Sequence, residues 1–361
     1  GAYINANLTS LSFGTWEVTD WSDSLSFTLT NNGIDTLSVG SIDLPDSNFH
    51  LVTTPAYPLK LATYQVDTLW VRFAPENRGS FVDSIMVNSN DTVRPALKIA
   101  VNGKGFIVDP AVSGTMYAGS GVTDFGRLRT VDPIDASTST IGPSGFNQLL
   151  NLRVRPSTGE LMGLATNSAT TAAEYDLVRI NSSLADAHSI AKIPLNFLKG
   201  MTYRNDTLYV GRITGGIYTV NPLTGTPTLV ASCGKQLAGI DFNPVTGELW
   251  ASVKGGVPVD GIYKISLPSG TATLVGTTGF GVGTVDIAFD ANGTLFGLIG
   301  TGTTPNQLVL IDTLTGGGTK IGPMGFASGQ AIAFHPDVTN FASSYHLFQK
   351  WNLMSLPVNV P

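Results

Sequence analysis

Hydrophobic and polar residues alternate in short runs along most of the chain. In SLSFTLTNNG, residues 24–33, Leu25, Phe27 and Leu29 fall on one face, and an Asn-Gly pair ends the run. A period of two is typical of a strand with one buried face, and Asn-Gly is typical of a tight turn between strands. The runs TLSVGSIDL, VDTLWVRFAP, SFVDSIMVNSND and ALKIAVNGKG repeat this pattern up to about residue 106. The sequence therefore predicts an all-β chain.

The first segment has the strand density of a small sandwich. About seven short strands within roughly 100 residues is the pattern of an immunoglobulin-like fold, which we predict for residues 1–107. The stretches FGTWEV, LTNNGIDTLSV, FAPENRGSF, NSND and VNGKG also resemble immunoglobulin-like modules of the abnormal-spindle/hydin type that are frequent in bacterial surface proteins. That resemblance implies a spacer or interaction module without catalytic residues.

From about residue 112 the sequence repeats. LLNLRVRPSTGELMGLA (149–165), LKGMTYRNDTLYVGR (198–212), LAGIDFNPVTGELWASV (237–253) and TVDIAFDANGTLFGLIG (284–300) align with one another. A third strand follows each, and in most repeats a turn ending in Thr-Gly or Ser-Gly comes next, as in IYTVNPLTGTPTLV. Four strands in a repeat of about 45 residues are typical of a β-propeller blade. The region resembles propeller-like repeats of bacterial secreted proteins.

The two ends of the repeat region complement each other. Residues 114–145 supply the second, third and fourth strands of a blade, and GQAIAFHPDVTN (329–340) supplies only a first strand. Together they predict a fifth blade that is shared between the two ends and closes the ring. We therefore predict a five-bladed β-propeller over residues 112–341, followed by an extension over residues 342–361.

The charge of the chain limits the classes of partner. Charged residues make up 13% of the chain, against about 25% in an average soluble domain. The net charge is −6, whereas binding to nucleic acid requires a basic surface. No apolar run approaches the roughly 18 residues of a membrane span. We expect an extracellular or cell-surface protein that binds no nucleic acid and has no membrane span.

Candidate chemistry in the repeat region is confined to the centre of the predicted ring. Aligned positions of the first strands place Arg153, Asp241 and Asp286 among small residues near the channel. Two interpretations remain open: an arginine–aspartate pair that fills a narrow channel, or a ligand site. No metal-binding or catalytic motif is present, and the acidic turns NSNDT (88–92) and DPIDAST (132–138) lack a complete calcium-loop pattern. We therefore predict no catalytic residue, metal or cofactor.

Aromatic residues of the first segment raise the question of sugar binding. Trp16 and Trp21 flank a short polar stretch, and Trp70 is expected to be buried in its alternating strand. A platform for sugar rings requires a pair of exposed aromatic side chains, which sequence alone does not identify.

The last residues, WNLMSLPVNVP (351–361), read as one more strand. After Trp351, the alternating residues Met354, Leu356, Val358 and Val360 fall on one apolar face. Ring closure does not require this strand, and it resembles the first strand of a further β-domain of the type that often follows such modules in bacterial surface proteins. It is expected to pack on its own chain, on a domain that is missing, or on another subunit, where it could add to an exposed sheet edge and build a filament.

These observations favour a non-enzymatic structural or adhesive protein whose partners are itself, other surface proteins or glycans. The alternatives are a propeller that binds carbohydrate or protein and, less favoured, a propeller hydrolase or lyase.

Overall fold

The computed structural model describes residues 1–168, 173–300 and 305–335. Within these ranges the regular structure is β-strand, apart from one 3-10 turn, η1 (Val122–Asp124), which confirms the predicted all-β class. None of the described residues forms a helix that is long and apolar enough to cross a membrane. The chain divides into two compact units, Gly1–Ile107 and Val108–Pro361.

The first unit consists of two sheets. Four strands form one sheet in the order β1 (Ile4–Ala6), β3 (Leu25–Asn31), β7 (Val66–Phe73), β5 (Phe49–Leu51). Five strands form the other in the order β2 (Ser10–Glu17), β9 (Ala96–Phe106), β8 (Gly79–Ser89), β4 (Leu37–Asp43), β6 (Leu59–Leu61). β2 runs parallel to β9, and the other neighbours are antiparallel.

Alternation along the strands builds one core between these two sheets. Phe27 and Leu29 on β3 are fully buried, as predicted, and Leu25 packs against the same core. On β7 the buried residues are Leu69, Val71 and Phe73. Burying each of these side chains contributes about 1.5–3 kcal/mol before the entropic cost of ordering it.

The prediction that Trp70 is buried is wrong. Its side chain is 44% exposed, because it lies between Leu69 and Val71 on a strand whose buried face those two residues occupy. The period of two was read correctly, but the indole was placed on the wrong face of the sheet.

The second unit contains five antiparallel sheets of four strands each. In sheet order they are β13 (Gln148–Val154), β14 (Leu161–Thr166), β15 (Tyr175–Ile180), β16 (Ala187–Ile193); β17 (Leu198–Arg204), β18 (Thr207–Arg212), β19 (Gly216–Val220), β20 (Pro227–Ser232); β21 (Leu237–Phe242), β22 (Leu249–Val253), β23 (Gly261–Ile265), β24 (Ala272–Thr277); β25 (Thr284–Phe289), β26 (Leu295–Ile299), β27 (Gln307–Ile311), β28 (Gly318–Pro323); and β29 (Gly329–Phe334), β10 (Met116–Ser120), β11 (Arg127–Val131), β12 (Thr138–Pro143).

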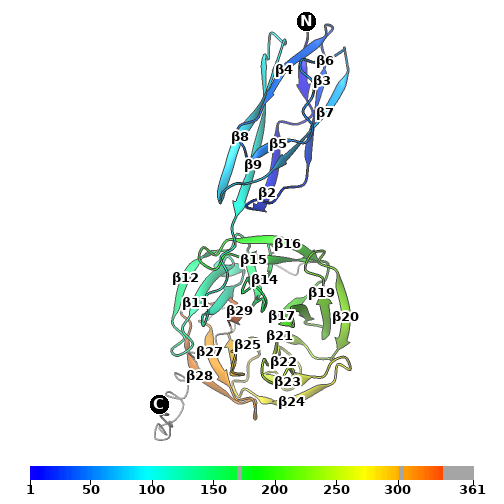
Figure 1. Cartoon of the computed structure of the whole chain (residues 1–361). Coiled ribbons are helices and arrows are strands. Elements are labelled where there is room, and N and C mark those ends of the chain that lie inside the picture. The colour runs from blue at the N-terminus through cyan, green and yellow to red at the C-terminus, as the bar shows by residue number, and fades with distance from the viewer. Residues whose placement is uncertain (169–172, 301–304, 336–361) are drawn as a thin grey trace, which may run out of the picture. The chain divides into compact units, whose positions relative to one another are not determined.

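The five sheets form a closed ring. Strands β13, β17, β21, β25 and β29, here called the inner strands, contact one another in cyclic order. Figure 1 shows β17, β21, β25 and β29 gathered at the centre of the ring. β29 pairs with β10, which confirms that the two ends of the repeat region share one sheet. Apolar residues fill the space between adjacent sheets, as where Leu164 of one sheet packs in the same cluster as Met201 and Val210 of the next.

Each inner strand has an irregularity at the same place. The pairing with the second strand skips one residue, which is the pattern of a β-bulge. The skipped residues are Leu150, Lys199, Ala238, Val285 and Gln330. A feature repeated in all five sheets belongs to the repeat itself.

The glycine that ends the Thr-Gly turns is required by the local geometry. In the turn between β19 and β20, the Asn221 side chain accepts the amide of Leu223, and Gly225 has a φ of +72°. A Cβ on Gly225 would collide with the carbonyl oxygen of Lys192, on the outermost strand of the preceding sheet. Gly225 is therefore required both by its backbone conformation and by the close approach of the neighbouring sheet.

Gly225→Ala is expected to destabilise the second unit by about 2–4 kcal/mol, because the left-handed conformation and the collision both add to the cost. Gly234→Ala is the matched control, because Gly234 has a φ of +63° but no atom within 4 Å of the added Cβ. This control should lose only about 1–2 kcal/mol. Urea unfolding measures both, and equal losses would contradict a packing role for Gly225.

Candidate functional site at the centre of the ring

Polar side chains from four of the inner strands converge at the centre of the ring. Arg153 comes from β13, Thr202 from β17, Asp241 from β21 and Asp286 from β25. Each is at most 8% exposed. On the other inner strands, the residues aligned with Arg153 include the small Ala288 and Ala333. The inner strands therefore approach closely enough for one arginine to reach across the centre.

The Arg153 guanidinium bonds mainly to backbone oxygens. Nη1 donates to the carbonyl oxygen of Ile332 at 2.8 Å, which lies on β29. Nη2 donates to the carbonyl oxygens of Ile240 at 2.8 Å and Ile287 at 2.6 Å, on β21 and β25. Nη1 also donates to the carbonyl oxygen of Leu152 at 2.6 Å, on its own strand. One side chain thus links four of the five inner strands.

Asp241 extends this network to the fifth inner strand. Its Oδ1 accepts from Arg153 Nε at 3.3 Å and from Thr202 Oγ1, on β17, at 2.6 Å. The amide of Phe242 donates to the same oxygen at 3.0 Å. Oδ2 accepts from the amide of Phe289 at 2.8 Å, so this carboxylate also bridges β21 and β25.

Asp286 lies on the other side of the guanidinium and is completely buried. Its oxygens lie 3.3 and 3.4 Å from Arg153 Nη1 and Nη2. The amides of Ile287 and Ile332 donate to them at 2.9 and 3.0 Å. Every oxygen of this carboxylate therefore has a charged and a neutral donor.

The electrostatics follow from burial and from these ion pairs. Burial raises the pKa of Asp286 to about 6, against the opposing effect of Arg153 and the two backbone amides. Burial lowers the pKa of Arg153, but its ion pairs with Asp241 and Asp286 raise that pKa by more, so it lies above its ordinary value. Arg153 therefore remains a cation wherever the protein is folded.

The structure brings together all three residues that were singled out at the ring centre. Of the two interpretations left open by the sequence, these contacts favour a packed ion pair, because the charged groups bond to one another and to backbone groups of the inner strands. Among the residues that the structure describes, no group of three or more histidine, cysteine, aspartate or glutamate side chains could hold a metal ion.

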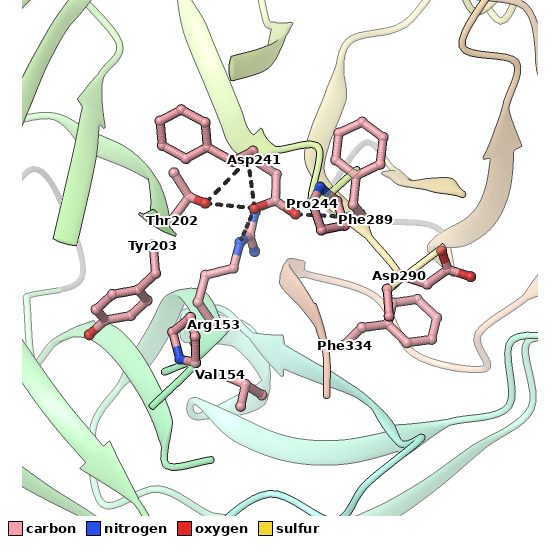
Figure 2. A pocket seen from close by; sticks show the side chains of 12 residues that line it. Arg153, Val154, Thr202, Tyr203, Asp241, Pro244, Phe289, Asp290 and Phe334 are labelled. Carbon is pink, nitrogen blue, oxygen red and sulfur yellow. Dashed lines mark hydrogen bonds and ion pairs between the residues drawn. The ribbon is translucent and has the colours of Figure 1, made fainter. Parts of the chain in front are cut away.

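A cavity of about 120 Å³ lies at the end of the inner strands beyond this network. Figure 2 shows Arg153, Thr202 and Asp241 at its centre, with Tyr203 and Phe334 among the side chains around it. Burial raises the pKa of the Tyr203 hydroxyl above its usual range, so it is neutral at physiological pH. The cavity offers apolar walls and two carboxylates, Asp241 and Asp290, both of which are largely buried.

Other residues from the sequence analysis lie elsewhere. Trp351, Met354, Leu356, Val358 and Val360 lie outside the described residues. In the acidic turn at 88–92, Asp91 accepts the amides of Ile4, Val93 and Arg94, so it bonds as a turn-forming residue. In the turn at 132–138, Asp132 and Asp135 accept the amides of Ile134 and Ser137.

Two exposed indole rings lie on the first unit. Trp21 is 52% exposed, and its ring centroid lies 4.6 Å from that of His50. His50 pairs across the strands with Arg72, and Trp70 lies two residues before Arg72 on the same outer face. Trp16 is half-buried and donates from its indole to the carbonyl oxygen of Phe13, so it belongs to the core. The pair of exposed rings is thus Trp21 and Trp70.

Sequence reasoning did not single out Thr202 or the backbone carbonyls that hold Arg153. In the aligned first strands, Thr202 occupies the same position as Arg153 and Asp241, and this position is the signal that could have identified it. The carbonyl partners have no signal in the sequence, because any residue supplies a carbonyl oxygen.

Comparisons with known proteins give distant similarities. No family model matches the chain, and a search of curated proteins finds no match. Among solved structures, the chain is similar to the ASH/PapD-like domain 7 of human CEP192, at 15% identity and a TM-score of 0.24, over 29% of this chain and 87% of that one. It is similar to TolB from Acinetobacter baumannii, at 11% identity and a TM-score of 0.41, over 68% of each chain. An auxiliary nutrient binding protein from Bacteroides thetaiotaomicron is similar at 10% identity and a TM-score of 0.35, over 88% of this chain and 69% of that one.

Arg153→Met is expected to destabilise the second unit by about 3–5 kcal/mol, because it leaves two buried carboxylates without their cation. Arg204→Met is the control, since Arg204 is exposed and its guanidinium lies 5.4 Å from the centre of the Phe242 ring. The control should lose no more than about 1 kcal/mol. Urea unfolding at neutral pH measures both, and a loss in Arg153→Met as small as in the control would contradict the network.

The penalty for Arg153→Met is expected to grow with pH. The folded-state pKa of Asp286, about 6, lies above its ordinary value of 3.8, so its contribution to stability is present at low pH and is lost as the pH rises through that window. Removing Arg153 raises this pKa further, which moves the loss to higher pH. The difference in free energy of unfolding between variant and wild type should therefore be larger at pH 8 than at pH 5, and a constant difference would contradict this account.

Proposed function

We propose that this chain is a non-enzymatic extracellular or cell-surface protein with a structural or adhesive role. In this proposal the first unit is an immunoglobulin-like sandwich and the second is a five-bladed β-propeller. Two sheets around one core support the first assignment, and five four-stranded sheets in a closed ring support the second.

The observation that carries the proposal is the bonding of Arg153. Propeller enzymes need polar side chains near the channel that are available to a substrate. Here the central guanidinium donates to carbonyl oxygens on β21, β25 and β29, and Asp286 accepts from backbone amides. The charged groups at the centre are engaged in holding the strands together, which favours a structural role for this part of the ring.

The adhesive part of the proposal rests on the alternating segment at 354–360. Burying its four apolar residues would contribute about 1.5–3 kcal/mol each before ordering costs. In the first unit, β2 is an eight-residue strand at the end of its sheet, while the other end strands have three residues each. β2 is therefore the longest edge in that unit to which a strand from another copy could add, and such a head-to-tail contact propagates.

The paired variants Leu356→Asp/Val358→Asp and Ser355→Asp/Asn359→Asp test this contact. Both pairs add two negative charges to the same segment, but only the first pair changes the apolar face. We expect wild type and the second pair to form larger species as concentration rises, and the first pair to stay monomeric by light scattering with size-exclusion chromatography. A wild-type protein that is monomeric throughout, and unchanged after deletion of residues 349–361, would overturn the proposed assembly.

A second candidate function is glycan binding by the first unit. The exposed rings of Trp21 and Trp70 lie on one sheet face with the donors His50 and Arg72. Flat aromatic faces pack against the carbon–hydrogen faces of sugar rings, and neighbouring donors can bind sugar hydroxyls. This observation favours carbohydrate as the partner of an adhesive protein.

Trp21→Ala and Trp70→Ala should each weaken binding to a glycan identified on an array by about tenfold or more, as expected for truncation of a central aromatic contact. Tyr64→Ala is the control, because Tyr64 is 73% exposed and lies outside this face. Biolayer interferometry on the immobilised glycan measures all three. An array without any bound glycan, or an equal loss in the Tyr64 variant, would reject this candidate.

A further inference from the structure

The end of the inner strands opposite the 120 Å³ cavity has its own small cavity. All five bulged residues line it: Leu150, Lys199, Ala238, Val285 and Gln330. Lys254, which directly follows β22, also lines it. We call this place the lysine mouth. Its charge is opposite to that of the other cavity, where Asp241 and Asp290 are among the lining residues.

Lys199 and Lys254 differ from the other described lysines of the second unit. Lys192 and Lys264 form ion pairs with carboxylates, and the ammonium groups of Lys235 and Lys320 lie over aromatic rings. Among the described residues, no ion pair, side-chain hydrogen bond or ring contact involves the ammonium group of Lys199 or Lys254. Among the described lysines of the second unit, the two that line the lysine mouth are therefore the two without such a partner.

This arrangement has an electrostatic cost. Lys199 is half-buried, and burial together with the charge of Lys254 lowers its pKa. Lys254 is exposed, so the cost falls mainly on the partly desolvated Lys199, and an anion bound beside the two ammonium groups would offset it. The lining residues include no acid that could supply that anion.

The shape of the lysine mouth restricts the anion. Its volume is about 10 Å³, which accommodates one water-sized group. Of the apolar residues that line it, Ile213 and Val285 are half-buried and can be reached from outside. A carboxylate on a short aliphatic stem fits this combination, because one of its oxygens can enter the space beside the lysines while its methylene groups lie outside, against Ile213 and Val285. A carboxylate attached directly to a sugar ring has no such stem.

We propose that the lysine mouth binds a carboxylate carried on a short aliphatic stem, as a glutamate side chain of a partner polypeptide presents it. Lys199 and Lys254 bind the carboxylate, and Gln330 supplies a further amide donor. This site is separate from the contact proposed for residues 354–360 and from the tryptophan face, so either of those can fail without affecting it.

The test is binding of a fluorescent hexaglutamate peptide, followed by anisotropy at 150 mM salt, with hexaglutamine as the uncharged reference. The Lys199→Met/Lys254→Met variant should bind at least about tenfold more weakly than wild type, since hydrogen bonds to a charged group are lost. The Lys235→Met/Lys320→Met variant removes the same charge elsewhere and should bind within about twofold of wild type. Circular dichroism checks that both variants fold.

Four results would overturn the proposal. Hexaglutamate could bind no better than hexaglutamine, which would show that the carboxylates are not recognised. Both double variants could lose affinity equally, which would indicate general attraction to a negative chain. Polygalacturonate could bind more tightly than hexaglutamate with the same dependence on Lys199 and Lys254, which would assign the site to an acidic glycan. Butyrate should compete more strongly than acetate, and equal competition would contradict the role of the aliphatic stem.

Discussion

The second unit depends on one buried cation. Five inner strands with mostly small residues at the centre could leave a polar channel whose backbone carbonyls have no donor, and unsatisfied buried backbone groups are costly. The guanidinium of Arg153 meets this need because it carries five donors in a planar arrangement and keeps its charge at all relevant pH values. Its four carbonyl bonds and two carboxylate partners come from four strands, and Thr202 joins the fifth through Asp241.

This arrangement differs from an isolated buried salt bridge. A buried ion pair often contributes little net stability, because desolvation offsets the attraction. At the ring centre, the same groups also satisfy backbone amides and carbonyls of strands that are far apart in the sequence. The closure of the ring through β29 brings Ile332 into this network, so the pairing of the two ends of the repeat region and the central ion pairs depend on each other.

The sequence predicted the parts of the structure that repeat. Alternation located the strands, and the aligned segments predicted that residues 329–340 and 114–145 share one sheet, which the pairing of β29 with β10 confirms. The same alignment listed Arg153, Asp241 and Asp286 as central residues. It could not predict the distances among them, since these depend on how closely five backbones approach.

The face of Trp70 was predicted wrongly for a different reason. Leu69, Trp70 and Val71 are three consecutive apolar residues, so alternation alone does not say which face of the strand is buried. The largest of the three was assumed to be buried, but Leu69 and Val71 occupy the buried face. The bulges of the five inner strands, such as the one at Lys199, were not predicted, because an extra residue in one strand has no distinctive composition.

The repeated bulge separates the start of each inner strand from the part that carries the central network. Each inner strand has one unpaired residue near its start, and this residue does not take part in the strand pairing that positions Arg153 and Asp241. Leu150 and Ala238 are buried, but Lys199, Val285 and Gln330 are partly exposed. The fold in this way provides three neighbouring positions whose side chains can change without altering the strand register that holds Arg153 and Asp241.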